Sequence, residues 1–294
     1  MYFEKNVKNN ITYSIDMLRL TTEITFFQYS ELEFRFKTVY SDYIKKFYQS
    51  CKFADYQYNF VIEVEEGSSF WFGFLHNSEK RSSTCDNVNY RFTIEFNPNK
   101  LKFNKLLLIV LYSFGDWKMR SFDVACDLSV NILDILGFEK GRKREIKMIS
   151  SGFDNKTIYI GKLDNRVKIY NKKIESNLDI KGDLTRVEIS KKLEDFPVKR
   201  IWAYHFDNVF PDLFLNEYLY SFKDYEDKTL LAVLYAVQND FPFDNLSRRY
   251  KEKIRELFCS GGQKILFDCK CVDDVLRKVI YSYFVQANSK QHFL

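Results

Sequence analysis

A tyrosine between two lysines is the first stretch of this sequence that could carry out chemistry. In the run NRVKIYNKKIES, Lys168, Tyr170 and Lys172 alternate with other residues, and Arg166 continues the same alternation. In a β-strand, residues two positions apart share a face. Positive charge beside a phenol favours its ionised form. The pattern therefore fits a tyrosine that attacks a phosphodiester, with cations on the same face of a strand.

Two further strand-like runs could bring carboxylates to the same surface. FDVACDL has an apolar face and a face with Asp123 and Asp127, and TRVEIS has an apolar face and a face with Arg186 and Glu188. If these strands and the tyrosine strand are neighbours in one antiparallel sheet, their polar faces merge. Carboxylate oxygens suit Mg²⁺ or Mn²⁺, which would offset charge on a phosphate. An arginine on this surface, Arg166 or Arg186, could hold that phosphate with two hydrogen bonds.

A plainer interpretation of these residues stays open. An antiparallel sheet commonly has one solvated face, and charged side chains are expected there. Cross-strand pairs of aspartate with lysine, or of glutamate with arginine, would account for the same residues without any chemistry.

Composition limits the classes of protein that this chain can belong to. Of 294 residues, 46% are hydrophobic, which is enough for a sizeable core and argues against global disorder. The net charge of +5 is compatible with a polyanionic partner but does not require one. The six cysteines form no Cys-x-x-Cys pair. The polar start MYFEKNVKNN and the lack of a long apolar run predict a cytoplasmic protein without a signal peptide or membrane span.

Periodicity predicts a strand-rich body followed by helices. Strands are expected over 10–24, 58–66, 69–76, 90–98, 119–130 and 184–192, with a hairpin over 157–173 whose loop spans 162–165. Helices are expected over 38–51, 100–112, 229–238, 245–258 and 272–284.

These elements predict an α+β fold. We expect an antiparallel sheet, either single or built from two copies of one strand pattern, with helices on one face. A helical C-terminal region follows it. The predicted boundary separates a β-rich domain over residues 1–200 from a helical region over residues 201–294.

The central residues resemble a known family. TIYIGKLDNRVKIYNKKIE, followed by TRVEI, is similar to the signature of the Rep_trans family of rolling-circle replication initiators from Gram-positive plasmids. The upstream FDVACDL looks like the Asp-x-Ala-x-Asp strand of the family, and YSIDMLRL resembles its opening strand. The resemblance covers most of residues 12–192.

The resemblance implies an enzyme that nicks and rejoins one strand of a plasmid origin in a topoisomerase-like reaction. Tyr170 matches the nucleophile, which would stay joined to the 5′ phosphate. Asp127 and Glu188 match acidic positions expected to hold Mg²⁺ or Mn²⁺, and Asp123 and Glu175 match further acidic positions. The family precedent also suggests a homodimer and a host helicase as partner. It makes the domain over residues 1–200 the nicking domain, and we expect the helical region over residues 201–294 to recognise the origin or to form dimer contacts.

The sequence departs from the family pattern at two places near the tyrosine. Lys168 stands where the family has arginine, so the charge is kept but the planar fork is lost. The run GKLDN replaces a Gly-Ser-Arg loop, which puts the loop contacts to DNA in doubt. The three histidines form no His-hydrophobe-His pair, so carboxylates are the remaining choice for a metal site.

Two basic segments are candidates for contacts with DNA. One is a loop with Lys140, Arg142, Lys143, Arg144 and Lys147, and the other is the face of a predicted helix with Arg248, Arg249 and Lys253. Such cations could neutralise phosphates and make the affinity depend on salt. Each segment could equally be a solvated loop or a helix face with internal ion pairs.

Two other functions remain open at this point. A relaxase for conjugative transfer would differ in the site that it nicks and in its partner proteins. A DNA-binding initiator or regulator without catalysis would bind its origin equally well with Tyr170→Phe and would never nick.

Overall fold

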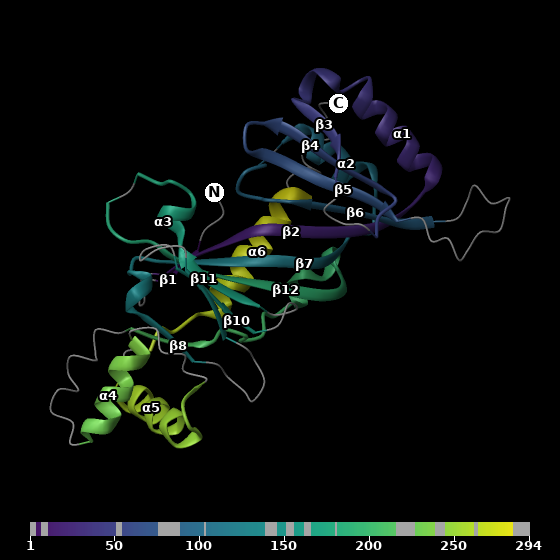
Figure 1. The fold of residues 1–294 in the computed structure, drawn as a ribbon. Helices are drawn as coiled ribbons and strands as arrows, with labels where there is room; N and C mark the ends of the chain where they lie inside the picture. Colours follow the sequence, from purple (N-terminus) through teal and green to yellow (C-terminus); the bar gives the residue numbers. More distant parts are fainter. Residues whose placement is uncertain are drawn as a thin grey trace.

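The body of the protein is one large antiparallel sheet (Figure 1). The computed structural model describes residues 4–6, 11–50, 55–75, 89–102, 104–138, 146–150, 156–161, 166–179, 181–215, 227–238, 245–261 and 264–284. Its main sheet has 11 strands in the order β3-β4-β5-β6-β2-β7-β12-β11-β10-β9, and β1 pairs with β2. Helices accompany this sheet, so the α+β prediction is confirmed.

The strands have the following bounds. They are β1 Glu4–Asn6, β2 Ile11–Thr25, β3 Lys46–Gln49, β4 Tyr58–Glu65, β5 Ser68–Leu75, β6 Asn89–Phe96, β7 Lys118–Leu128, β8 Ile135–Phe138, β9 Ile146–Ser150, β10 Lys156–Ile160, β11 Val167–Asn171, β12 Thr185–Pro197 and β13 Asp212–Leu215. The predicted hairpin is formed by β10 and β11, which pair in antiparallel register. β8 and β13 form a separate two-stranded sheet.

The helices have the following bounds. The α-helices are α1 Phe26–Lys37, α2 Lys105–Ser113, α3 Lys172–Glu175, α4 Lys228–Gln238, α5 Arg248–Gly261 and α6 Cys269–Phe284, and the 3₁₀ helices are η1 Ser41–Tyr43, η3 Ile132–Asp134 and η5 Val198–Ala203. Among the described residues, we find no helix with the length and apolar character needed to cross a membrane.

Helices pack on the apolar face of the sheet. Phe72 of β5 lies against Phe36 of α1, with ring centroids 5.7 Å apart, and Phe96 of β6 lies 5.1 Å from Tyr283 of α6. Phe72 and Phe96 belong to one buried cluster that also holds the inward side chains of β7, β11 and β12. Figure 1 shows α6 crossing the sheet behind β2 and β7. Burial of these aromatic and aliphatic side chains drives the sheet and helices together.

The helices α4 and α5 share a second, smaller core. Leu230 and Leu234 of α4 pack with Ile254 and Leu257 of α5 and with Phe214 of β13. In contrast, α6 packs on the main sheet through the larger core. The C-terminal region thus contributes both a small helical pair and a helix of the sheet's own core. A domain boundary near residue 200 stays a prediction.

The expected helix over residues 38–51 is wrong. This segment contains η1 and then β3, and Val39 and Tyr43 are each more than 60% exposed, so the apolar spacing does not correspond to a buried face. The helix lies just before it, as α1. Thr25 and Gln28 form a capping box there, which satisfies backbone donors at the start of the helix. That box, together with apolar residues at helical spacing, was a signal present in the sequence.

Candidate active site on the polar face of the sheet

The three predicted strands are neighbours, and their polar faces merge as expected. Tyr170 of β11 lies opposite Arg186 of β12, and Arg186 lies opposite Asp127 of β7. One residue pair further along the same face, Lys168 lies opposite Glu188. The alternation of strand side chains is therefore sufficient to bring the tyrosine, the cations and the carboxylates to one surface.

Tyr170 is held by a hydrogen bond to a carboxylate. Its hydroxyl group donates to Oε2 of Glu188 at 3.0 Å. The Nζ atom of Lys168 lies 3.9 Å from the centre of the tyrosine ring, and that of Lys172 lies 5.7 Å from it. Both lysines thus face the ring, where a cation–π contact is favourable. Tyr170 is only 4% exposed, so these neighbours nearly cover it.

The lysines do not make Tyr170 acidic, contrary to the sequence-based expectation. Burial raises the pKa of Tyr170 well above its ordinary value, and the negative charge of Glu188 raises it further. The charge of Arg186 lowers this pKa, but by less than burial and Glu188 raise it. At neutral pH the phenol is therefore protonated, and an attack by its oxygen requires a base. Glu188 already accepts the hydrogen bond of the Tyr170 hydroxyl group, so it lies within reach to act as that base.

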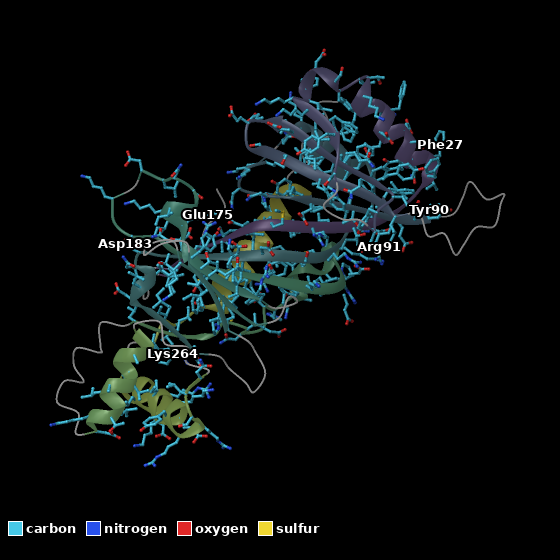
Figure 2. The ribbon with its side chains drawn as sticks, in the orientation of Figure 1. Phe27, Tyr90, Arg91, Glu175, Asp183 and Lys264 are labelled. Carbon is cyan, nitrogen blue, oxygen red and sulfur yellow. The ribbon has the colours of Figure 1, made fainter. Side chains whose placement is uncertain are left out.

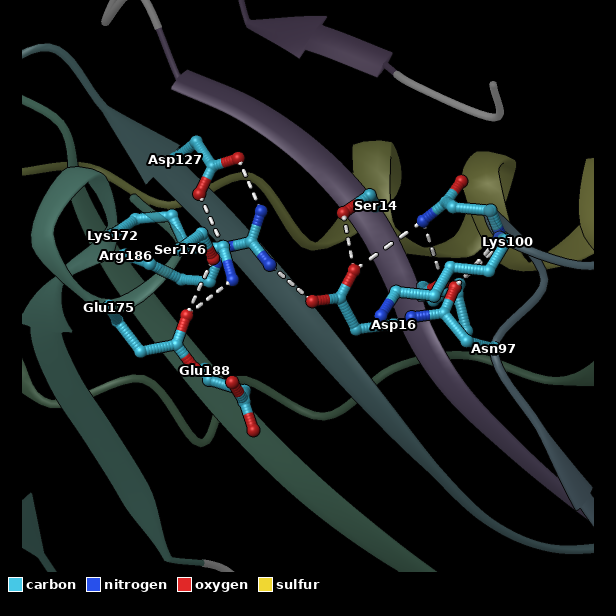
Figure 3. Close-up of polar contacts among 12 residues, drawn as sticks. Ser14, Asp16, Asn97, Lys100, Asp127, Lys172, Glu175, Ser176, Arg186 and Glu188 are labelled. Carbon is cyan, nitrogen blue, oxygen red and sulfur yellow. Dashed lines mark hydrogen bonds and ion pairs between the residues drawn. The ribbon is translucent and has the colours of Figure 1, made fainter. Parts of the chain in front are cut away.

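Arg186 is engaged by two carboxylates (Figure 3). Its Nε and Nη2 atoms donate to the two oxygens of Asp127 at 2.6 and 2.7 Å, and its Nη1 donates to Oδ2 of Asp16. Burial would lower the pKa of Arg186, but the hydrogen bonds with Asp127 and the charges of Asp16 and Asp127 outweigh it. The fork that was expected to hold phosphate thus faces carboxylates.

Asp123 lies in a half-buried, acidic part of the same face. It pairs across strands with Ser190 and accepts a hydrogen bond from it. Burial raises the pKa of Asp123 to about 6, and the charges of Glu188 and Glu95 add to this rise. The hydrogen bond from Ser190 lowers the pKa of Asp123, as does the charge of Arg19, which forms an ion pair with Glu95, but burial outweighs both. Part of the Asp123 population is therefore neutral near pH 6.

The remaining predicted residues lie at the edge of this surface. Glu175 accepts hydrogen bonds from Lys172 and Ser176, each at 2.7 Å. Burial alone would raise the pKa of Glu175, but these two bonds and the lysine charge hold it below its ordinary value. The guanidinium of Arg166 lies over the ring of Tyr159, 4.9 Å from its centre. Figure 2 shows Glu175 at one end of the sheet and Arg91 at the other.

The carboxylates predicted to hold a metal are each bound to a donor of the protein. Both oxygens of Asp127 bind Arg186, Glu188 binds Tyr170, and Glu175 binds Lys172. Across the described ranges of the chain, no group of three or more His, Cys, Asp or Glu side chains is arranged to hold a metal ion. To hold a divalent cation jointly, Asp127 and Glu188 would have to exchange these hydrogen-bond partners for the metal. A requirement for Mg²⁺ or Mn²⁺ stays a prediction.

The basic residues predicted to contact DNA are placed only in part. Residues 140–144 lie outside the described residues, and Lys147 lies on β9. On α5, Arg248 forms an ion pair with Glu252 at 2.7 Å, and Lys253 forms one with Asp227 at 2.9 Å. Arg249 is exposed. Of the helix-face ion pairs that the sequence left open, Arg248 with Glu252 is therefore present, whereas Lys253 pairs with Asp227, which precedes α4. Exposed pairs of this kind leave the cations accessible to phosphate.

Sequence reasoning missed Asp16. It lies in a β-bulge of β2, where the register against β7 shifts between Ile15 and Met17. A bulge turns a side chain away from the strict alternation of a strand. The polar residue in the opening strand was visible, but nothing in the sequence marks the bulge that directs it toward Arg186.

This chain was compared with family models, curated proteins and solved structures, and it shows limited similarity to a solved structure. No protein-family model matches this chain, and no curated protein matches it. Among solved structures, a rolling circle replication initiator protein from Geobacillus stearothermophilus aligns with 63% of this chain and 76% of its own chain. The aligned residues are 14% identical, and the TM-score is 0.37.

Proposed function

We propose that this protein nicks and rejoins DNA at an origin and thereby starts rolling-circle replication of a plasmid or mobile element. The observation that carries the proposal is the hydrogen bond from Tyr170 to Glu188, surrounded by cations on one face of the sheet. The motif resemblance described above points to the same tyrosine. DNA is the substrate, and the acceptor in rejoining is a 3′ hydroxyl group of DNA.

The chemistry uses groups that already lie in contact. The Tyr170 oxygen attacks phosphorus and forms a phosphotyrosine bond with the 5′ end, while the bond from phosphorus to the 3′ oxygen breaks. The phenol proton passes to Glu188. The leaving 3′ oxygen keeps the electron pair of the broken bond and takes a proton from water, whose hydroxide is neutralised by the proton on Glu188. In rejoining, the 3′ hydroxyl attacks phosphorus and releases its proton through water to Glu188, while the bond from phosphorus to the Tyr170 oxygen breaks and Tyr170 takes a proton back from Glu188.

The lysines contribute charge to phosphate in this proposal. Lys168 and Lys172 lie above the ring of Tyr170, where a phosphate approaching the phenol oxygen would meet them. Preorganised positive charge of this kind stabilises a transition state that carries more negative charge than the substrate. Lys172 must share its charge with Glu175, so Lys168 is expected to contribute more.

The test is nicking of supercoiled DNA that carries the element's own origin. Wild type, Tyr170→Phe and Tyr159→Phe are each incubated with that DNA in Mg²⁺, in Mn²⁺ and in EDTA. Tyr159 is a matched control, because it lies on the neighbouring strand β10, directly opposite Lys168. Relaxed DNA is measured on gels, and the covalent adduct is measured after protease-free denaturation.

The outcomes separate the functions that the sequence left open. Loss of both relaxation and adduct in Tyr170→Phe, but not in Tyr159→Phe, supports the proposal. Nicking at a transfer origin rather than a replication origin would favour a conjugative relaxase. Tight origin binding without nicking by any of the three proteins would favour a non-catalytic initiator. Activity in EDTA would show that the predicted metal is not needed.

A further inference from the structure

The network around Arg186 joins three strands of the sheet. Arg186 lies on β12, Asp127 on β7 and Asp16 on β2. The guanidinium has two hydrogen bonds to Asp127 and one to Asp16, and its side chain is only 10% exposed. The guanidinium has little freedom to rotate, because Asp127 holds its Nε and Nη2 atoms and Asp16 holds its Nη1 atom.

Asp16 is itself supported by neighbouring groups. The Ser14 hydroxyl and the Asn99 amide each lie 3.4 Å from Oδ1 of Asp16. Asn99 also donates to the backbone oxygen of Ile15 at 3.0 Å, which ties the bulge to the turn after β6. Figure 3 shows Asp16 between Ser14 and the guanidinium. The bulge therefore presents a fixed carboxylate to Arg186.

The network lies directly beside the reacting groups of the proposed function. Arg186 is the cross-strand partner of Tyr170, and Glu188 follows two residues later on the same face of β12. A change in the position of Arg186 would shift the short stretch of β12 that also carries the base Glu188. It would therefore change the distance between Glu188 and Tyr170. A displacement of about 1 Å at such a site can cost about a hundredfold in rate.

We propose that Asp16 is a positioning residue, which together with Asp127 clamps Arg186 and thereby sets the geometry between Tyr170 and Glu188. This inference rests on the proposed function. It makes Arg186, instead of a metal ion, the partner of Asp127. The Asp16 carboxylate binds Arg186, Ser14 and Asn99, whereas the Tyr170 phenol donates to Glu188. Its effect passes through Arg186.

The clamp can be observed without any nicking. In ¹H–¹⁵N spectra of the full-length protein, restricted rotation should make the Nη–H groups of Arg186 visible as separate signals, assigned by their absence from Arg186→Lys. In Asp16→Asn, the Nη1 signals should shift or merge, while the Nε–H signal, which reports on Asp127, should stay. Asp116→Asn is the control, because Asp116 is exposed and forms an ion pair with Lys199 just before the start of β7, whereas Asp127 lies near the end of that strand.

Positioning is then tested by kinetics on origin DNA. Asp16→Asn should lower the rate of adduct formation by about tenfold to a hundredfold, while the Kd for DNA stays within about twofold, because the substrate contacts are intact. Ser14→Ala, a milder change that leaves the charge of Asp16 in place, should give a smaller loss and serves if Asp16→Asn does not fold.

Each outcome bears on the clamp alone. Unchanged Arg186 signals in Asp16→Asn would refute the clamp, and changed signals with an unchanged nicking rate would refute its positioning role. An equal loss of DNA affinity and rate would also overturn it, since that pattern indicates lost binding. Failure of the proposed function is recognised separately, because Tyr170→Phe would then behave like wild type.

Discussion

Replacing Asp123 with asparagine should stabilise the protein at alkaline pH and have no such effect in acid. The folded protein raises the pKa of Asp123 from its ordinary value of 3.8 to about 6, chiefly by burial. The folded state thus binds the Asp123 proton more tightly than the unfolded state does. The stability that this proton contributes is fully present below about pH 4 and is lost as the pH rises through about 6.

The magnitude follows from the two pKa values. Their difference of about 2 corresponds to about 3 kcal/mol, since each pKa unit is worth about 1.4 kcal/mol. Asp123 is partly exposed, and solvent screening lowers the expected gain to about 2 kcal/mol at pH 8. Asparagine carries no charge at any of these pH values, so Asp123→Asn avoids the cost of the buried carboxylate.

The assay is urea unfolding of wild type and Asp123→Asn at several pH values between 4 and 8, in EDTA to keep divalent cations away. The difference in free energy of unfolding should be near zero at pH 4 and reach its full value at pH 8. Asp116→Asn should show no gain at pH 8, because Lys199 holds the pKa of Asp116 below its ordinary value. A variant less stable than wild type at pH 8, or a difference that does not change with pH, would refute the reasoning.

Four further predictions test the packing, the helix cap, the DNA contacts and the recognition of the origin. Gly73→Ala should destabilise the sheet by about 1 to 3 kcal/mol in thermal unfolding, because a methyl group there would lie 2.5 Å from the Trp71 ring. Gly115→Ala is the control, because nothing lies within 4 Å of a methyl group at that position. Thr25→Ala should cost about 1 kcal/mol through loss of the capping box of α1, measured by urea unfolding, and an unchanged midpoint would contradict it. Arg249→Ala should weaken origin binding and lower the salt dependence of the affinity by about one ion. Exchange of residues 240–294 with those of a related initiator should change the origin preference. An unchanged preference would exclude this segment as the part that recognises the origin.

Strand alternation was sufficient to predict that Tyr170, Lys168 and Glu188 share one face, although it did not predict Asp16. Each strand side chain alternates between two faces, so the local pattern alone placed Tyr170, Lys168 and Glu188 together once the strands were neighbours. The apolar faces of the same strands predicted the sheet and the side on which helices pack. The helix over residues 38–51 was wrong because apolar spacing does not report whether a segment is buried.

The sequence by itself determined the kinds of group on the polar face, because side-chain direction in a strand is a local property. Only the tertiary structure decided how those groups are paired and how acidic they are. The bulge at Asp16 gives Arg186 a second carboxylate from a strand about 170 residues away in the chain, and no local pattern marks that choice. Burial raised the pKa of Tyr170 although lysines flank it, because desolvation depends on everything that packs around the phenol.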